Sequence, residues 1–133
     1  MENKRVKKLK GISKTKNKFL NASRGIYIAF KEESSLIVYL IAIILVIALG
    51  IWLVLSYDQW ALLLLTIGVV IGFEFVNTSI ENFVDLLSFE YNIKAKKIKD
   101  IGAAASIINA LISVAIGFLI LLPHLVEKIQ GYF

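Results

Sequence analysis

The sequence predicts an all-α membrane protein, with an N-terminal amphipathic surface helix followed by three transmembrane helices. Of its 133 residues, 58% are hydrophobic, and the mean hydropathy is +0.76. Both values are high for a soluble domain and exclude a disordered chain. The apolar residues are also concentrated in long runs, and about 20 consecutive apolar residues are enough to cross a bilayer.

Several classes of chemistry are excluded by composition alone. The chain has no cysteine, so it can form no disulfide, no cysteine-based metal site and no thiol nucleophile. Its single histidine, His124, cannot build a multi-histidine metal site. The length corresponds to one domain, spanning residues 1–133.

Three spans follow from the apolar runs. We predict the first over residues 36–57 and the third over residues 101–122, both without a charged residue, with Pro123 ending the third. The second is predicted over residues 60–89. It is apolar from Trp60 to Phe73 and then continues at helical spacing with polar residues on one face.

The basic residues predict the orientation. Ten of the 15 Lys and Arg residues precede the first span, and four more, Lys94, Lys96, Lys97 and Lys99, form a predicted loop between the second and third spans. With three spans, both blocks lie on one side, which the positive-inside rule places in the cytoplasm. We therefore expect a multi-pass protein of the cell membrane with a cytoplasmic N-terminus and an extracytoplasmic C-terminus.

Residues 1–34 are expected to lie at the cytoplasmic membrane surface. Residues 1–18 are a polybasic tail suited to anionic lipid. From about Asn17 onward, apolar and charged residues alternate as in an amphipathic interfacial helix. Binding of nucleic acid is not expected, because it would need a soluble basic fold.

The second span carries a polar stripe, formed by Glu74, Asn77, Glu81 and Asp85. Their spacings of 3, 4 and 4 residues place them within a wedge of about 80° on one helix face. A charged side chain at mid-bilayer costs at least about 2.5–3.5 kcal/mol, so such residues face a protein interior or a water-filled cavity. The stripe is therefore not expected to face lipid.

Three interpretations of the stripe compete. In the first, the carboxylates pair with the lysines of the basic block, which suits Asp85 but not the deeper Glu74. In the second, they form an ion or proton path. In the third, they are an enzyme site in which carboxylates bind Mg²⁺ and one acts as a base. Residue types alone do not decide between an ion or proton path and an enzyme site. The Lys99-Asp100 pair at the depth of Asp85, followed by small residues at 102–106, favours the enzyme.

The motifs themselves resemble a known family. FEFVNTSIENFVD (Phe73 to Asp85), AKKIKDIGAAAS (Ala95 to Ser106) and the Phe-Lys-Glu-Glu element (Phe30 to Glu33) resemble the membrane-integral prokaryotic diacylglycerol kinases. The resemblance covers the whole chain. The Phe-Lys-Glu-Glu element and the Leu-Pro that ends the third span are similar to the Gram-positive branch, whose members phosphorylate undecaprenol.

The resemblance implies roles for individual residues. Glu74 corresponds to the catalytic base, and Glu33 and Glu81 correspond to the Mg²⁺-binding pair, with Asn77 and Asp85 on the same polar face. The residues implied in ATP binding are Lys99, Asp100, Glu90, Tyr91, Asn92 and Lys14. Asn92 stands where the family usually has histidine, and Ile98 replaces the alanine before Lys-Asp.

The implied activity is transfer of the γ-phosphate of ATP to a membrane lipid alcohol, undecaprenol first and diacylglycerol second. The alternative is a small oligomeric ion or proton channel that uses the intramembrane carboxylates. One subunit has too little surface to shield the stripe from lipid, so a closed oligomer is expected. The resemblance makes it a homotrimer with sites shared between subunits. The sequence contains no Walker loop or Gly-rich kinase loop, which excludes a soluble-kinase mechanism.

Overall fold

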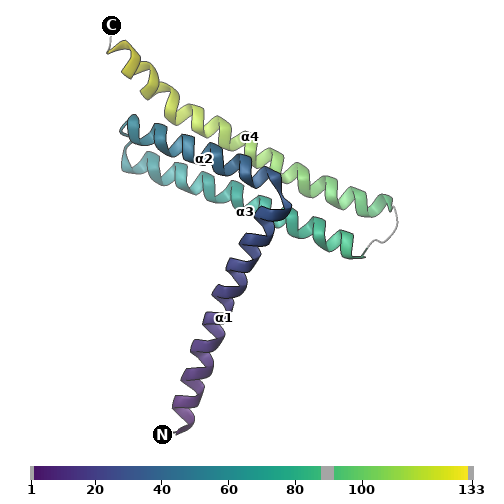
Figure 1. Ribbon diagram of the computed structural model, residues 1–133. Helices are drawn as coiled ribbons and strands as arrows, with labels where there is room; N and C mark the ends of the chain where they lie inside the picture. The colour runs from purple at the N-terminus through teal and green to yellow at the C-terminus, as the bar shows by residue number, and fades with distance from the viewer. Residues whose placement is uncertain (1, 88–91, 132–133) are drawn as a thin grey trace. The chain divides into compact units, whose positions relative to one another are not determined.

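Most of the chain is helical in the part that the structure describes. The computed structural model describes residues 2–87 and 92–131, with side chains from residue 14 onward. Over these residues it forms α1 (Glu2–Glu32), α2 (Ser34–Trp52), α3 (Tyr57–Leu87) and α4 (Ile93–Gln130) (Figure 1). α2, α3 and α4 are each long and apolar enough to cross a membrane. The prediction of an all-α protein with three candidate spans is confirmed.

The chain divides into two units, residues 1–34 and residues 35–133. α1 makes up nearly all of the first. It is helical from Glu2, so the segment expected to be a tail is part of a helix. That α1 is amphipathic and binds anionic lipid at the membrane surface stays a prediction.

The connection between α2 and α3 is longer than predicted and begins earlier in the chain. α2 ends at Trp52 and α3 begins at Tyr57, whereas the sequence predicted a first span to Tyr57 and a second from Trp60. The end of α2 is closed by a backbone hydrogen bond of 3.2 Å from the Leu55 N–H to the Gly50 carbonyl. Val54 takes the left-handed position of this turn, at φ 58°. Because glycine usually occupies that position, the sequence contained no signal for a stop here.

α4 also differs from the prediction. The third span was expected to end at Pro123, and the four lysines before it were expected in a loop. Instead α4 is one helix from Ile93 to Gln130, with Pro123 inside it and the lysines in its first turns. Proline is tolerated within membrane helices. Beside it, the His124 Nδ1 lies 3.0 Å from the Ile120 carbonyl oxygen.

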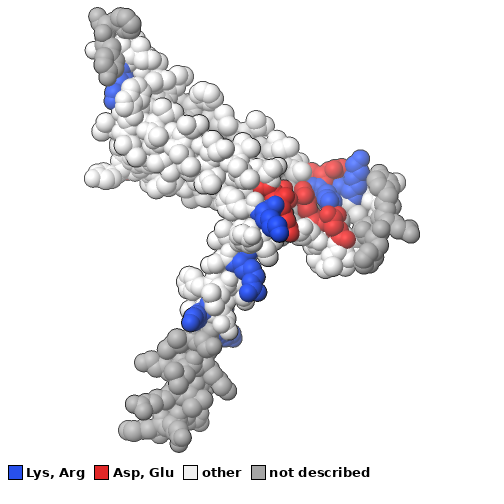
Figure 2. Space-filling model, in the orientation of Figure 1, with Lys and Arg blue, Asp and Glu red and all other residues white. Residues whose placement is uncertain are grey.

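α3 and α4 pack along one another, and α2 runs beside them (Figure 1). A small apolar core of Leu53, Leu55, Leu63 and Ile120 lies at the end where α2 turns into α3. The charged side chains of α3 and α4 gather mainly at the opposite end, where α3 ends and α4 begins (Figure 2). The helix bundle thus has an apolar body with a polar end.

Candidate functional site

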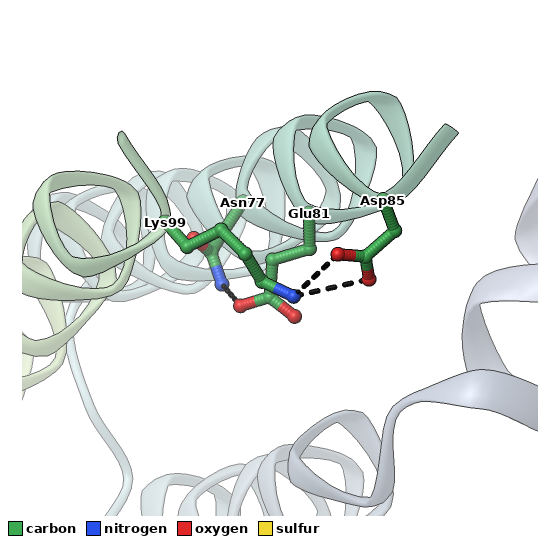
Figure 3. Close-up of polar contacts among 4 residues, drawn as sticks. All are labelled: Asn77, Glu81, Asp85 and Lys99. Carbon is green, nitrogen blue, oxygen red and sulfur yellow. Dashed lines mark hydrogen bonds and ion pairs between the residues drawn. The ribbon is translucent and has the colours of Figure 1, made fainter. Parts of the chain in front are cut away.

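The predicted polar stripe lies on one face of α3, since residues 57–87 form one unbroken helix. Burial decreases along it. Glu74 is 6% exposed and Asn77 is 9% exposed, whereas the Asp85 side chain is 63% exposed. Figure 3 shows Asn77, Glu81 and Asp85 projecting from the same side of α3. The stripe therefore leads from a buried carboxylate to the polar end of the bundle.

Two hydroxyl groups donate hydrogen bonds to Glu74, one to its carboxylate and one to its backbone carbonyl. The Ser35 hydroxyl, in the first turn of α2, donates a hydrogen bond to Glu74 Oε1. The Thr78 hydroxyl donates to the Glu74 backbone carbonyl at 2.9 Å. A buried carboxylate is tolerated only when it is hydrogen-bonded, and Ser35 supplies that bond from a different helix.

Glu81 is held from its own helix. The side-chain amide of Asn77 donates from Nδ2 to Glu81 Oε1 at 2.9 Å (Figure 3). The two residues are four apart, the spacing at which helix side chains meet. Asn77 thus joins the buried and the half-buried parts of the stripe.

Lys99 reaches across from α4 to the outer end of the stripe. Its Nζ lies 2.9 Å from Asp85 Oδ1 and 3.0 Å from Asp85 Oδ2 (Figure 3). The ion pair confirms that Lys99 lies at the depth of Asp85. Because both side chains are partly exposed, the pair contributes about 0–1 kcal/mol to stability. Asp100, next to Lys99, is exposed.

Asn92 has a structural role in this chain. It is the N-cap of α4, where its Oδ1 accepts hydrogen bonds from the backbone N–H groups of Lys94 at 2.9 Å and Ala95 at 3.4 Å. Such a cap is typical of asparagine. The other two residues of the predicted nucleotide stretch, Glu90 and Tyr91, lie outside the described residues.

Glu33 and Lys14 belong to the first unit. Glu33 follows α1, and its backbone N–H donates to the Ala29 carbonyl at 2.8 Å. Lys14 lies exposed on α1. Pairing of Glu33 with Glu81 therefore stays a prediction.

The side chains of the polar stripe include carboxylates, which are of the ligand type that Mg²⁺ takes in proteins. Within residues 14–87 and 92–131, no three His, Cys, Asp or Glu side chains gather as a metal-binding group. Mg²⁺ is usually held by one or two carboxylates together with waters and substrate phosphates. A carboxylate such as Glu81, at the polar end of the bundle, fits that requirement.

An apolar groove of about 400 Å³ lies between α2, α3 and α4. The hydroxyls of Thr66 and Ser113, which line it, donate to carbonyls of their own helices at 2.7 Å. At its inner end the groove is lined by Tyr39 of α2 and Val70 of α3. Ser35 and Glu74 lie four residues further along these same two helices, about one helical turn. The groove therefore ends close to the buried carboxylate.

Two residues of the site were missed by sequence reasoning. Ser35 carried no signal, because a serine at the start of a span does not reveal which helix it faces. Gly102 was assigned only to close helix packing. An added Cβ there would lie 2.7 Å from Asn77 Oδ1, so this glycine also borders the polar stripe.

Comparison with known proteins agrees with the motifs. A model of the prokaryotic diacylglycerol kinase family matches residues 20–121. The undecaprenol kinase of Bacillus subtilis is 36% identical over 107 residues, which cover 80% of this chain and 87% of that protein. A diacylglycerol kinase of Helicobacter pylori is 31% identical over 102 residues (77% and 80%), and that of Escherichia coli strain K12 is 28% identical over 96 residues (72% and 74%).

These matches confirm the resemblance seen in the motifs and leave the channel interpretation without support, since the matched relatives are named as kinases. The family match includes the whole of α2 and α3, and α4 as far as residue 121. Together with the three candidate spans, it identifies a multi-pass membrane protein. The chain belongs to the prokaryotic diacylglycerol kinase family.

Proposed function

We propose that this protein is a lipid kinase that transfers the γ-phosphate of ATP to the hydroxyl group of a membrane lipid alcohol. The observation that carries the proposal is the position of Glu74. It is a buried carboxylate one helical turn beyond the end of an apolar groove, on a chain that belongs to a lipid kinase family. A lipid tail in the groove would bring its hydroxyl towards this carboxylate.

In the proposed reaction, Glu74 accepts the proton of the lipid hydroxyl. The lipid oxygen forms a bond to the γ-phosphorus, the bond between that phosphorus and the bridging oxygen breaks, and ADP leaves. Phosphoryl transfer needs mainly positioning and neutralisation of charge. Lys99 and Asp100 bind ATP in this proposal, together with Glu90, Tyr91, Asn92 and Lys14.

Mg²⁺ is the proposed cofactor. Glu33 and Glu81 would hold it, and when bound it would offset the negative charge of the ATP phosphates. Asn77 orients the Glu81 carboxylate by its hydrogen bond. Asp85 holds the Lys99 ammonium group at the polar end of the bundle.

Undecaprenol is the proposed acceptor and diacylglycerol the second choice. The support is that the undecaprenol kinase is 36% identical to this chain, whereas the diacylglycerol kinases are 28% and 31% identical. The groove also suits a hydrocarbon chain, because its lining is mainly apolar and the hydroxyls of Thr66 and Ser113 already donate to backbone carbonyls.

The proposed assembly is a homotrimer in the cell membrane, with the N-terminus in the cytoplasm and α1 near anionic lipid. Nearly all cationic residues lie on the predicted cytoplasmic side, where ATP is available. A closed oligomer would shield the Glu74 stripe from lipid.

The experiment that tests the function is phosphorylation of undecaprenol and of diacylglycerol by the purified protein in bilayer nanodiscs with Mg²⁺ and radiolabelled ATP. We expect both the wild type and Glu127→Gln, an exposed control at the far end of α4, to phosphorylate undecaprenol. Glu74→Gln should lose about 10²–10⁴ in rate, as expected for loss of a general base. A wild type inactive on both lipids would contradict the proposal, and turnover by Glu74→Gln within a few-fold of wild type would exclude Glu74 as the base.

A further inference from the structure

The side-chain amide of Asn77 makes a hydrogen bond through its nitrogen but, among the described residues, none through its oxygen. Its Nδ2 donates to Glu81 Oε1 at 2.9 Å. Its Oδ1 is buried and has no hydrogen-bond partner among the described residues. A buried carbonyl oxygen without a partner is unfavourable, so something other than Oδ1 must hold the amide in this orientation.

The donor end explains the direction of the amide. A carboxylate oxygen can only accept from the amide NH₂ group, and an amide turned over would bring its oxygen against Glu81 instead. Glu81 therefore determines which end of Asn77 faces it. The Oδ1 atom is left to face the neighbouring helix.

Gly102 of α4 provides the space for that oxygen. A Cβ added to Gly102 would lie 2.7 Å from Asn77 Oδ1, closer than real Cβ contacts. The next contacts of such a Cβ, with two carbons of Ile80, would be at an ordinary 3.7 Å. Among the nearest contacts of such a Cβ, only the one with the Asn77 amide would be too close.

Moving the Asn77 amide away from such a Cβ would disturb its hydrogen bond to Glu81. Asn77 is 9% exposed, so its amide has little room to move away. Rotating the amide about χ2 would move Oδ1 but would also swing Nδ2 out of line with Glu81 Oε1. A further cross-helix bond, from the Ser106 hydroxyl to the Phe73 carbonyl at 3.3 Å, lies one turn along α4 and opposes separation of the helices.

We infer that Gly102 is a positioning residue for the Glu81 carboxylate and that it acts through the Asn77 amide. Through Gly102, α4 thereby influences the geometry of the Glu81 carboxylate on α3 without a direct contact between Gly102 and Glu81. The functional consequence rests on the proposed function, in which Glu81 helps to bind Mg²⁺ with ATP.

The first test is a double-mutant cycle on stability, measured without Mg²⁺ or ATP by unfolding in SDS. Gly102→Ala should destabilise the wild type but not the Asn77→Ala protein, in which the oxygen is gone. Gly117→Ala is the matched control, because it makes the same change in α4 where a Cβ would meet nothing within 4 Å. Additive effects of Gly102→Ala and Asn77→Ala would overturn the inference.

The second test separates positioning from packing. Gly102→Ala should raise the KM for Mg–ATP by about tenfold, the size expected for one lost hydrogen bond to a charged group. The KM for the lipid should stay within twofold. In the Asn77→Ala background, Gly102→Ala should change neither. Equal changes in both KM values, or an unchanged KM for Mg–ATP, would show a packing role only.

Failure of Gly102→Ala to fold would also be informative. The Asn77→Ala/Gly102→Ala protein, which has room for the added methyl group, should then fold, and its failure to do so would overturn the inference. If the wild type phosphorylates neither lipid, the proposed function fails, while the stability cycle still tests the contact between Gly102 and Asn77.

Discussion

Ser35 and Glu74 lie 39 residues apart in the chain and are joined by a hydrogen bond from the serine hydroxyl to the glutamate Oε1. The bond ties the start of α2 to the middle of α3. It also fixes the direction of the Glu74 carboxylate, the group that accepts the lipid hydroxyl proton in the proposed mechanism.

Replacing Ser35 with alanine should lower kcat for lipid phosphorylation by roughly tenfold, because Glu74 would lose the hydrogen bond that fixes its carboxylate. Steady-state kinetics in nanodiscs would measure this. Ser34→Ala, next to it and exposed, is the matched control and should retain wild-type kcat. Equal effects of the two substitutions would show that the bond to Glu74 has no part in the reaction.

Filling the apolar groove should weaken binding of the lipid alcohol. Gly117→Leu places a side chain in the groove at a position where a Cβ meets nothing within 4 Å, so the fold should be retained. We expect the KM for undecaprenol to rise several-fold, while the KM for ATP stays unchanged. Gly68→Leu, at an exposed position of α3 that is equally open and outside the groove, is the control. An unaffected lipid KM in Gly117→Leu would show that the tail binds elsewhere.

Glu81→Gln and Glu33→Gln should each weaken binding of Mg–ATP, because a site with two protein carboxylates tolerates the loss of neither. Their effects should be non-additive, as expected for residues of one site. Isothermal titration with Mg²⁺ and a non-hydrolysable ATP analogue would measure both single variants and the double variant. Independent, additive effects would separate Glu33 from the Glu81 site.

Mixing two inactive variants tests whether sites are shared between subunits. Glu74→Gln subunits co-reconstituted with Lys99→Ala subunits should recover part of the activity if one subunit supplies the carboxylate and its neighbour the lysine. Mixed oligomers would be verified with two affinity tags. No recovery in such oligomers would place Glu74 and Lys99 of each site on one chain.

Val54→Gly should stabilise the protein by about 1 kcal/mol, because a β-branched residue at φ 58° is strained and glycine is not. Unfolding in SDS would measure the difference. Val69→Gly, at an exposed position inside α3, is the control and should destabilise by about 0.4 kcal/mol. A loss of stability in Val54→Gly would mean that packing of the valine side chain outweighs the backbone strain.

The sequence by itself determined the helical class, the three candidate spans, the polar stripe and the family. These properties depend on local patterns: long apolar runs, and carboxylates spaced at 3 and 4 residues along one helix. The spacing was enough to place Glu74, Asn77, Glu81 and Asp85 on one face, because a helix fixes the direction of each side chain. The ends of the helices were predicted less well. Val54 takes a turn position that glycine usually occupies, and Pro123 lies inside α4 and does not end it.

Only the tertiary structure decided which residues of other helices meet that face. Ser35 reaches Glu74 from α2, Lys99 reaches Asp85 from α4, and Gly102 leaves room for the Asn77 oxygen. Each of these contacts depends on how two helices are rotated and shifted against one another. That geometry arises from packing over the whole interface, and no local pattern in the sequence encodes it.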